Sequence, residues 1–144
     1  MLDVYLSVLK RYAFFSGRAG RREFWLFTLA NFIITIALQA PGFLIRAVLG
    51  SNIVAAGLAG MFAILALLYS LAVLVPSLAV GVRRLHDTGR SGWWLAIVLV
   101  PFVGAIVLIV FYVLESQPGT NRWGPNPRDS AMTAQPAYAI DRPL

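Results

Sequence analysis

Three uncharged, mostly apolar runs limit what this chain can fold into. They cover residues 24–45, 47–82 and 91–114, and only five formally charged residues lie between Glu23 and Glu115. A transmembrane helix needs about 20 predominantly apolar residues to cross about 30 Å of hydrocarbon. Each run is long enough, so the sequence predicts an all-α integral membrane protein with three transmembrane helices.

Composition and charge agree with a membrane location. Hydrophobic residues make up 59% of the 144 residues and charged residues 12%, whereas an ordinary soluble domain is about 25% charged. The chain has no cysteine, which excludes disulfides, thiolate metal sites and cysteine nucleophiles. The net charge of +6 comes from basic residues at the edges of the apolar runs rather than from a Lys/Arg-rich run. This arrangement favours membrane lipids as partners over nucleic acid.

The chain divides into three parts. Residues 1–23 form an N-terminal segment, residues 24–116 a transmembrane domain with helices at about 24–45, 58–82 and 93–114, and residues 117–144 a Gly/Pro-rich motif with a disordered tail. Apolar residues near the N-terminus recur at helical spacing, which predicts an amphipathic helix in the membrane interface. Packing of this helix on a partner or on its own bundle fits the pattern equally well. These apolar positions are Leu2, Tyr5, Leu6, Leu9 and Tyr12.

The third run leaves two topologies open. Pro101 and Gly104 interrupt it, so we expect a kinked complete crossing, with a re-entrant hairpin as the alternative. A fourth crossing inside residues 47–82 is disfavoured, because 36 residues less a connection do not comfortably hold two helices. The arginine distribution predicts a cytoplasmic N-terminus, and three crossings would leave the tail on the opposite side.

The first run carries a polar stripe. Asn31, Thr35 and Gln39 recur every four residues and so lie on one helix face. In hydrocarbon such groups should face protein, because an unsatisfied amide is costly there. We expect hydrogen bonding between helices. The alternative is a lined polar pathway in a small transporter or channel component.

Two segments gather arginine and tryptophan at helix ends, over residues 15–25 and 83–94. Guanidinium groups bind phosphate in a planar, bidentate geometry. The segments therefore form a candidate site for anionic lipid headgroups or for a protein partner. The alternative is an ordered structural cluster in which Glu23 or Asp87 pairs with arginines. The candidate residues are Arg18, Arg21, Arg22, Arg83, Arg84, His86, Asp87 and Arg90.

The residues give little support for catalysis. His86 is the single histidine, so a metal site would need carboxylates to complete it. No nucleophile elbow, Walker loop or dinucleotide fingerprint is present. We expect a non-enzymatic protein without metal or cofactor, whose partners are membrane lipids and a membrane-protein partner or a second copy. An enzyme acting on lipid phosphates through His86 and Asp87 is the alternative.

Three motifs also carry a family resemblance. They cover residues 17–25, 83–94 and 119–127, and with them the chain resembles the YhaH-like family of small bacterial inner-membrane proteins, the domain of unknown function 805. The resemblance covers about residues 1–127 and implies a multi-pass inner-membrane protein, without a reaction or ligand to carry over. Trp123 stands where Phe or Tyr is expected. If the third motif acts with the other two, the tail must return to their side of the membrane.

Overall fold

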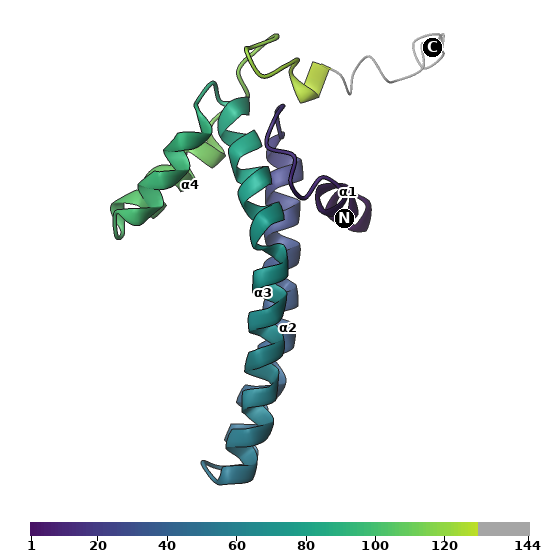
Figure 1. The fold of residues 1–144 in the computed structure, drawn as a ribbon, viewed down its shortest axis with the longest axis vertical. Coiled ribbons are helices and arrows are strands. Elements are labelled where there is room, and N and C mark those ends of the chain that lie inside the picture. The colour runs from purple at the N-terminus through teal and green to yellow at the C-terminus, as the bar shows by residue number, and fades with distance from the viewer. Residues whose placement is uncertain (130–144) are drawn as a thin grey trace, which may run out of the picture. The chain divides into compact units, whose positions relative to one another are not determined.

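The computed structural model describes residues 1–129. All regular secondary structure in this range is helical, and one isolated bridge joins Asn121 and Gly124. The all-α prediction is therefore confirmed for this part of the chain. The disordered tail predicted beyond it lies outside the described residues. The helices are α1 (Leu2–Lys10), α2 (Arg21–Leu49), α3 (Ile53–Asp87), the 3₁₀ helix η1 (Gly92–Leu99) and α4 (Val103–Val113) (Figure 1).

The chain forms two compact units. The first unit comprises Met1–Ala13 and Trp25–Leu78, and the second comprises Phe14–Phe24 and the residues from Ala79 onward. Helices α2 and α3 thus contribute most of their length to the first unit and one end each to the second.

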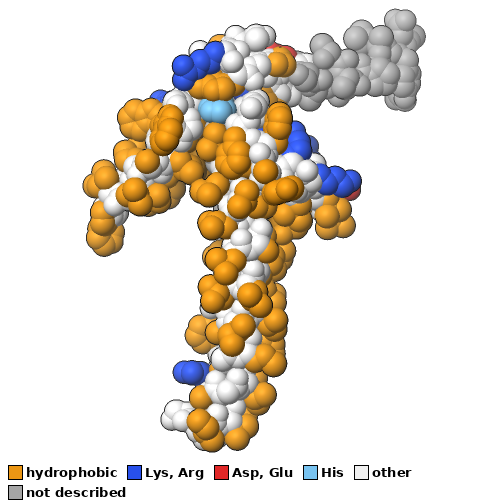
Figure 2. All heavy atoms as spheres, viewed as in Figure 1, with side chains coloured by type: hydrophobic (Ala, Val, Ile, Leu, Met, Phe, Trp, Pro, Cys, Tyr) orange, Lys and Arg blue, Asp and Glu red, His pale blue; other side chains and the backbone are white. Residues whose placement is uncertain are grey.

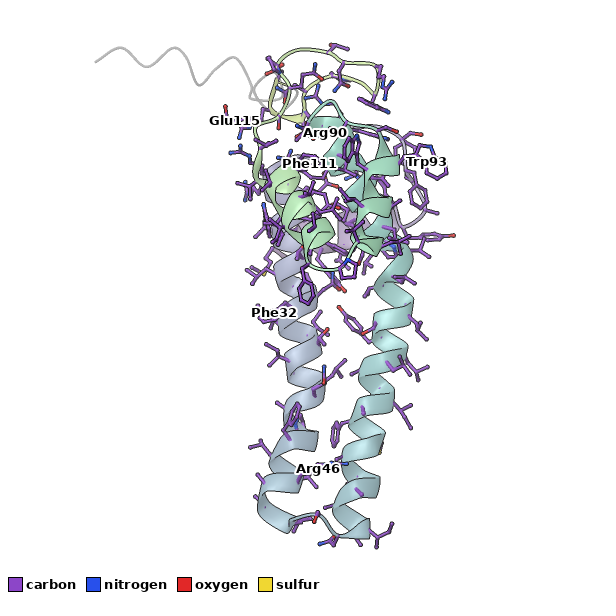
Figure 3. All side chains as sticks on the ribbon, turned by 90° about the vertical axis from the view of Figure 1, so that its left-hand side faces the viewer. Phe32, Arg46, Arg90, Trp93, Phe111 and Glu115 are labelled. Carbon is purple, nitrogen blue, oxygen red and sulfur yellow. The ribbon has the colours of Figure 1, made fainter. Side chains whose placement is uncertain are left out.

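In the first unit, α2 and α3 lie side by side and antiparallel (Figures 1 and 3). The connection is short because Gly50 adopts φ +73°, and the Asn52 side chain caps α3 by accepting a hydrogen bond from Ala55 N at 2.8 Å. Small residues let the helices approach closely, since a Cβ on Gly42 would lie 3.3 Å from the carbonyl oxygen of Ala59. Ala55 and Ala59 are buried, which supports internal packing by small residues.

Both long helices have the length and apolar composition to cross a membrane. Both helices expose large apolar side chains, with Phe32 of α2 62% and Ile64 of α3 59% exposed. Figure 2 shows hydrophobic side chains along the visible face of this helix pair. Helix α2 runs through the Pro41-Gly42 pair to Leu49, and proline is tolerated inside membrane helices.

Helix α1 contacts the same unit through one face. The Tyr5 ring stacks on Phe27 with 5.3 Å between centroids, and its hydroxyl lies 2.9 Å from that of Tyr69. Val8 is fully buried, although the predicted apolar face omitted it. Packing on its own bundle therefore accounts for one side of α1. Leu2 and Leu6 stay exposed, and their insertion in the membrane interface remains a prediction.

The members of the polar stripe differ in their contacts. Asn31 Nδ2 donates to the carbonyl oxygen of Phe27, and Asn31 Oδ1 accepts a hydrogen bond of 2.5 Å from the Tyr69 hydroxyl of α3. Asn31 therefore links two helices, as predicted. Gln39, two turns further on, lines an open groove with Phe43 and Arg46 instead.

In the second unit, residues 92–113 do not form the single helix predicted over 93–114. They form η1 and α4, which reverse direction at residues 100–102 and pack against each other. Pro101 cannot continue a helix hydrogen-bond ladder, and Phe102 adopts φ +61°. Gly104 completes the turn, because a Cβ there would lie 1.8 Å from the carbonyl oxygen of Ile97. The observed arrangement is a helical hairpin.

Candidate functional site: a buried arginine–aspartate cluster

The end of α3 is set by its own sequence. Gly89 adopts φ +78°, its N–H donates to the His86 carbonyl at 3.0 Å, and Arg90 N donates to the Leu85 carbonyl at 2.9 Å. These two bonds form the Schellman motif that satisfies the last carbonyls of a helix. The Thr88-Gly89 pair between the arginines is therefore a helix stop, and it fixes Asp87 in the last turn.

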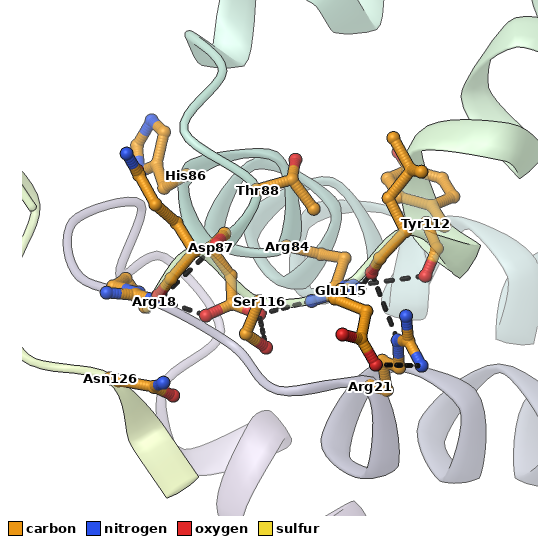
Figure 4. A network of polar contacts seen from close by, with 12 residues as sticks. Arg18, Arg21, Arg84, His86, Asp87, Thr88, Tyr112, Glu115, Ser116 and Asn126 are labelled. Carbon is orange, nitrogen blue, oxygen red and sulfur yellow. Dashed lines mark hydrogen bonds and ion pairs between the residues drawn. The ribbon is translucent and has the colours of Figure 1, made fainter. Parts of the chain in front are cut away.

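Asp87 is the centre of the cluster (Figure 4). Its Oδ1 accepts a hydrogen bond of 2.9 Å from Arg18 Nε, and its Oδ2 accepts from Arg84 Nη1 and from the Ser116 hydroxyl. The side chains of Asp87 and Arg84 are fully buried, and that of Arg18 is 1% exposed. One carboxylate thus joins the loop before α2, the end of α3 and the segment after α4.

Backbone carbonyls complete the cluster. Arg18 donates to the carbonyl oxygens of Gly119 at 2.7 Å and Gln117 at 2.5 Å. Two arginines share one carboxylate here, so a net positive charge is buried, and burial of a charge is costly unless it is paired and hydrogen-bonded. The carbonyl dipoles supply the remaining acceptors. In return, Gln117 N donates to the Asp87 carbonyl at 2.8 Å.

Arg84 also caps α4. Its guanidinium donates to the carbonyl oxygens of Tyr112 at 3.1 Å and of Leu114. These carbonyls lie at the C-terminus of the helix, where the dipole favours a cation and the last acceptors lack partners within the helix. Burial lowers the pKa of Arg84, and the Asp87 carboxylate opposes that shift. Arg84 therefore stabilises the end of the hairpin and the centre of the cluster together.

A second ion pair, with a buried arginine and a partly exposed glutamate, lies beside the first. Arg83 Nη1 contacts Glu23 at 2.8 Å, and the Arg83 side chain is 1% exposed. The Arg83 carbonyl accepts a hydrogen bond from Ala19 N at 3.0 Å. Arg83 Nε and Nη2 make no hydrogen bond within the described residues. The sequence analysis gave this pairing of Glu23 with an arginine as part of the alternative to ligand binding.

His86 connects the cluster to the third motif. Its Nδ1 lies 3.2 Å from the Gly17 carbonyl, so this nitrogen carries the proton, and its ring stacks on Trp123 at 4.4 Å. Asn121 Nδ2 donates to the His86 carbonyl at 2.9 Å. Burial lowers the pKa of His86, the hydrogen bond to Gly17 opposes this, and the charge of Arg122 adds to the lowering.

The other arginines remain on the surface. Arg22 is exposed, and Arg21 bonds the Leu114 carbonyl at 3.0 Å while lying 3.8 Å from Glu115. The guanidinium of Arg90 lies 4.1 Å above the Phe111 ring, and Figure 3 shows these two side chains together. Arg122 lies 3.9 Å above the Trp123 ring. Of these four, Arg22 and Arg122 are exposed, and Arg21 and Arg90 are half-buried.

The structure thus divides the eight predicted site residues. Arg18, Arg83, Arg84, His86 and Asp87 are buried in internal contacts, whereas Arg21, Arg22 and Arg90 are half-buried or exposed. The interpretation as an ordered structural cluster accounts for the first group.

Sequence reasoning missed most acceptors in the cluster, because they are backbone carbonyls, which carry no residue-type signal. The exception is the Asp87 carboxylate, which the sequence analysis named as a partner for the arginines. The carbonyls that were missed belong to Tyr112, Leu114, Gln117 and Gly119.

Fold and site define a small all-helical protein with two long apolar helices and a buried ion cluster at one end of them. A family model described as "Protein of unknown function (DUF805)" matches residues 12–125, and the chain belongs to this family. All three sequence motifs lie in or next to that range.

Named relatives agree with a membrane location. Inner membrane protein YhaI of Escherichia coli K12 is 44% identical over 124 residues, covering 86% of this chain and 94% of YhaI. Inner membrane protein YhaH of the same strain is 44% identical over 127 residues, covering 88% of this chain and 98% of YhaH. Uncharacterized protein YiiR of Escherichia coli K12 is 36% identical over 90 residues, covering 62% of this chain and 51% of YiiR. No solved structure matches the chain significantly.

Proposed function

We propose that the chain is a multi-pass inner-membrane protein that binds anionic phospholipid headgroups through the arginines outside the buried cluster. The observation that carries this proposal is the division of the arginines. Arg18 and Arg84 are committed to Asp87 and to carbonyls, whereas Arg22 and Arg122 present their guanidinium groups at the surface of the same unit. The buried group holds the face together, and the exposed group binds phosphate.

The topology we propose has two crossings, by α2 and α3, and a hairpin that returns to its starting side. It is supported by contacts within the second unit. Ala19 N bonds the Arg83 carbonyl, and Asn121 bonds the His86 carbonyl, so segments before α2, after α3 and after α4 share one face. Basic residues concentrate in these segments, which favours a cytoplasmic position. Three complete crossings would separate the third motif from the other two.

Reporter fusions after Leu144 test this topology. A green fluorescent protein fused there should fluoresce and an alkaline phosphatase should be inactive, because both report a cytoplasmic end. The same reporters inserted after Asn52, in the connection between α2 and α3, should give the opposite result. An active phosphatase after Leu144 would contradict this topology and support three crossings.

Lipid selectivity tests the binding. The full chain is reconstituted in phosphatidylcholine vesicles, and electron paramagnetic resonance compares spin-labelled phosphatidylglycerol with spin-labelled phosphatidylcholine at the protein surface. We expect preference for the anionic lipid, reduced by about fivefold for each arginine lost in the Arg22→Gln and Arg122→Gln variants. The Arg22→Lys and Arg122→Lys variants should keep most of it. Equal association of both lipids with the wild-type protein at moderate salt would contradict the proposal.

A binding role is proposed in preference to an enzymatic one. Three donors occupy the Asp87 carboxylate, and the His86 ring is stacked and bonded to a carbonyl. Neither group is placed to move a proton on a substrate. A protein partner or a second copy, and a transport role for the polar stripe, remain predictions without a supporting contact among the described residues.

A further inference from the structure

The hairpin of η1 and α4 is a fixed reversal built from apolar residues. No charged residue occurs over residues 91–114. The turn is held by backbone bonds, with Val100 N donating to the Ile97 carbonyl at 2.9 Å and Gly104 N donating to the Val100 carbonyl at 2.9 Å. Pro101 has no N–H to satisfy. The tip therefore satisfies its own donors at these positions, a requirement for backbone in hydrocarbon.

The base of the hairpin lies at the ion cluster, and the tip lies away from it. Three successive contacts of the chain leaving α4 follow α3 toward its C-terminus. A Cβ on Gly81 would lie 3.1 Å from the Tyr112 hydroxyl, the Leu114 carbonyl accepts from Arg84, and Gln117 N bonds the Asp87 carbonyl. The chain over residues 112–117 therefore runs along the last turns of α3 toward the cluster, so the base of the hairpin lies there.

The length of the hairpin matches one leaflet. Eight residues of 3₁₀ helix span about 16 Å at about 2.0 Å per residue. The eleven residues of α4 also span about 16 Å, at about 1.5 Å per residue. A hydrocarbon core of about 30 Å gives about 15 Å per leaflet.

Exposure along the hairpin matches lipid as its surroundings. At the tip, Leu99 is 81% and Phe102 86% exposed, and Figure 2 shows hydrophobic side chains over the visible face of the hairpin. At the base, Trp93 is 87% exposed and Arg90 covers Phe111. An indole and a guanidinium at one end and bare apolar groups at the other form the pattern of a segment entering from a membrane interface.

Resting on the proposed topology, we propose that this hairpin inserts into the single leaflet on the side of the ion cluster and acts as a wedge. It adds the cross-section of two helices to that leaflet, and a complete crossing would add area to both. The protein should therefore favour membranes whose cluster-side leaflet is convex, as segments inserted at an interface do.

Insertion depth is tested with single cysteines, because the natural chain has none. In oriented vesicles, a membrane-impermeant maleimide should label Thr88→Cys and Glu115→Cys from one side and Asn52→Cys from the other. Phe102→Cys should be labelled from neither side. Labelling of Glu115→Cys from the side of Asn52→Cys would show a complete crossing, and rapid labelling of Phe102→Cys would show a hairpin lying in water. Either result would overturn the wedge.

Curvature preference is tested in tubes pulled from giant vesicles of phosphatidylcholine alone, so that headgroup charge does not contribute. With the cluster side outward, we expect about twofold enrichment of the full chain in the tube. A variant with a trimmed tip, Leu99→Ala with Phe102→Ala, should lose most of this enrichment. Phe43→Ala, which trims an exposed residue of α2, should keep it. Equal density of wild type in tube and vesicle, or equal enrichment of the trimmed variant, would contradict the proposal.

The headgroup-binding variants separate the two proposals. Arg22→Gln with Arg122→Gln should lose selectivity for phosphatidylglycerol and keep the tube enrichment. The trimmed tip should do the reverse. A melting temperature measured in detergent checks that each variant is folded, and the labelling pattern in the cysteine variants tests insertion independently of the trimmed tip.

Discussion

The two units of this protein are held together by different chemistry. In the first, α2 and α3 pack through small residues, with one chain of hydrogen bonds through Tyr5, Tyr69 and Asn31. In the second, a carboxylate shared by Arg18 and Arg84 joins segments distant in sequence. Lipid tails are as apolar as leucine, so close packing is what distinguishes helix contact from lipid contact. In the second unit the Asp87 carboxylate instead accepts hydrogen bonds from three segments at once.

Loss of the shared carboxylate should have the largest effect. Asp87→Asn leaves two buried guanidinium groups without their counter-charge, and such a change costs about 3–5 kcal/mol. We expect a large drop in melting temperature in detergent. The matched control is Glu115→Gln, since Glu115 is 80% exposed and lies 3.8 Å from Arg21, and an exposed pair contributes about 0–1 kcal/mol. Similar losses in both variants would mean that Asp87 is not the centre of the unit.

Substitutions at two glycines, one in each unit, should differ in their effect on stability, and the larger effect should be of intermediate size. Gly104→Val would force η1 and α4 apart, because a Cβ at this position overlaps the Ile97 carbonyl. We expect a loss of about 1–3 kcal/mol, as for overpacked sites. Gly57→Ala in α3 meets nothing within 4 Å and should be neutral or slightly stabilising, because alanine favours a helix. Thermal unfolding of both variants by circular dichroism compares them, and a destabilised Gly57→Ala would indicate a contact absent from this structure.

The Asn31 side-chain amide in the first unit should contribute less to the stability of the fold. Asn31→Leu removes the bond to Tyr69, and hydrogen bonds between membrane helices average about 0.6 kcal/mol. The Gln39→Leu control lies in the open groove and should leave the melting temperature unchanged. A larger loss for Gln39→Leu than for Asn31→Leu would assign the stripe a role other than helix association.

The smallest expected effect is a dependence on pH. Burial and then the charge of Arg122 lower the pKa of His86 below its ordinary value of 6.5, so the folded state binds fewer protons than the unfolded state. Stability from this group is complete above pH 6.5 and is lost as the pH falls below that value toward the folded pKa. Melting temperatures between about pH 8 and about pH 5 should show the decline. The His86→Phe variant keeps a ring against Trp123 but cannot titrate, so its melting temperature should depend less on pH.

Particular residues show how far sequence reasoning reached. Charge-free runs located α2 and α3, because the need for about 20 apolar residues is a property of the bilayer. The spacing of Asn31 indicated its link between helices, and arginines with Asp87 were singled out as one group. Over residues 93–114 the sequence predicted a kinked helix, with a hairpin turning at Pro101 and Gly104 as the alternative. The structure has the hairpin, because α4 packs back onto η1, a contact that local sequence does not show.

The sequence by itself determined a helical chain, the two long apolar helices α2 and α3 among the three that it predicted, and the residue types of the ion cluster. These depend on composition and on local spacing, which act within one helix. Only the tertiary structure decided which arginines are buried, that carbonyls after α4 complete their hydrogen bonds, and that Trp123 meets His86. Those choices depend on contacts between segments about 30 to 100 residues apart, and a buried charge can be accommodated only once all its partners are assembled.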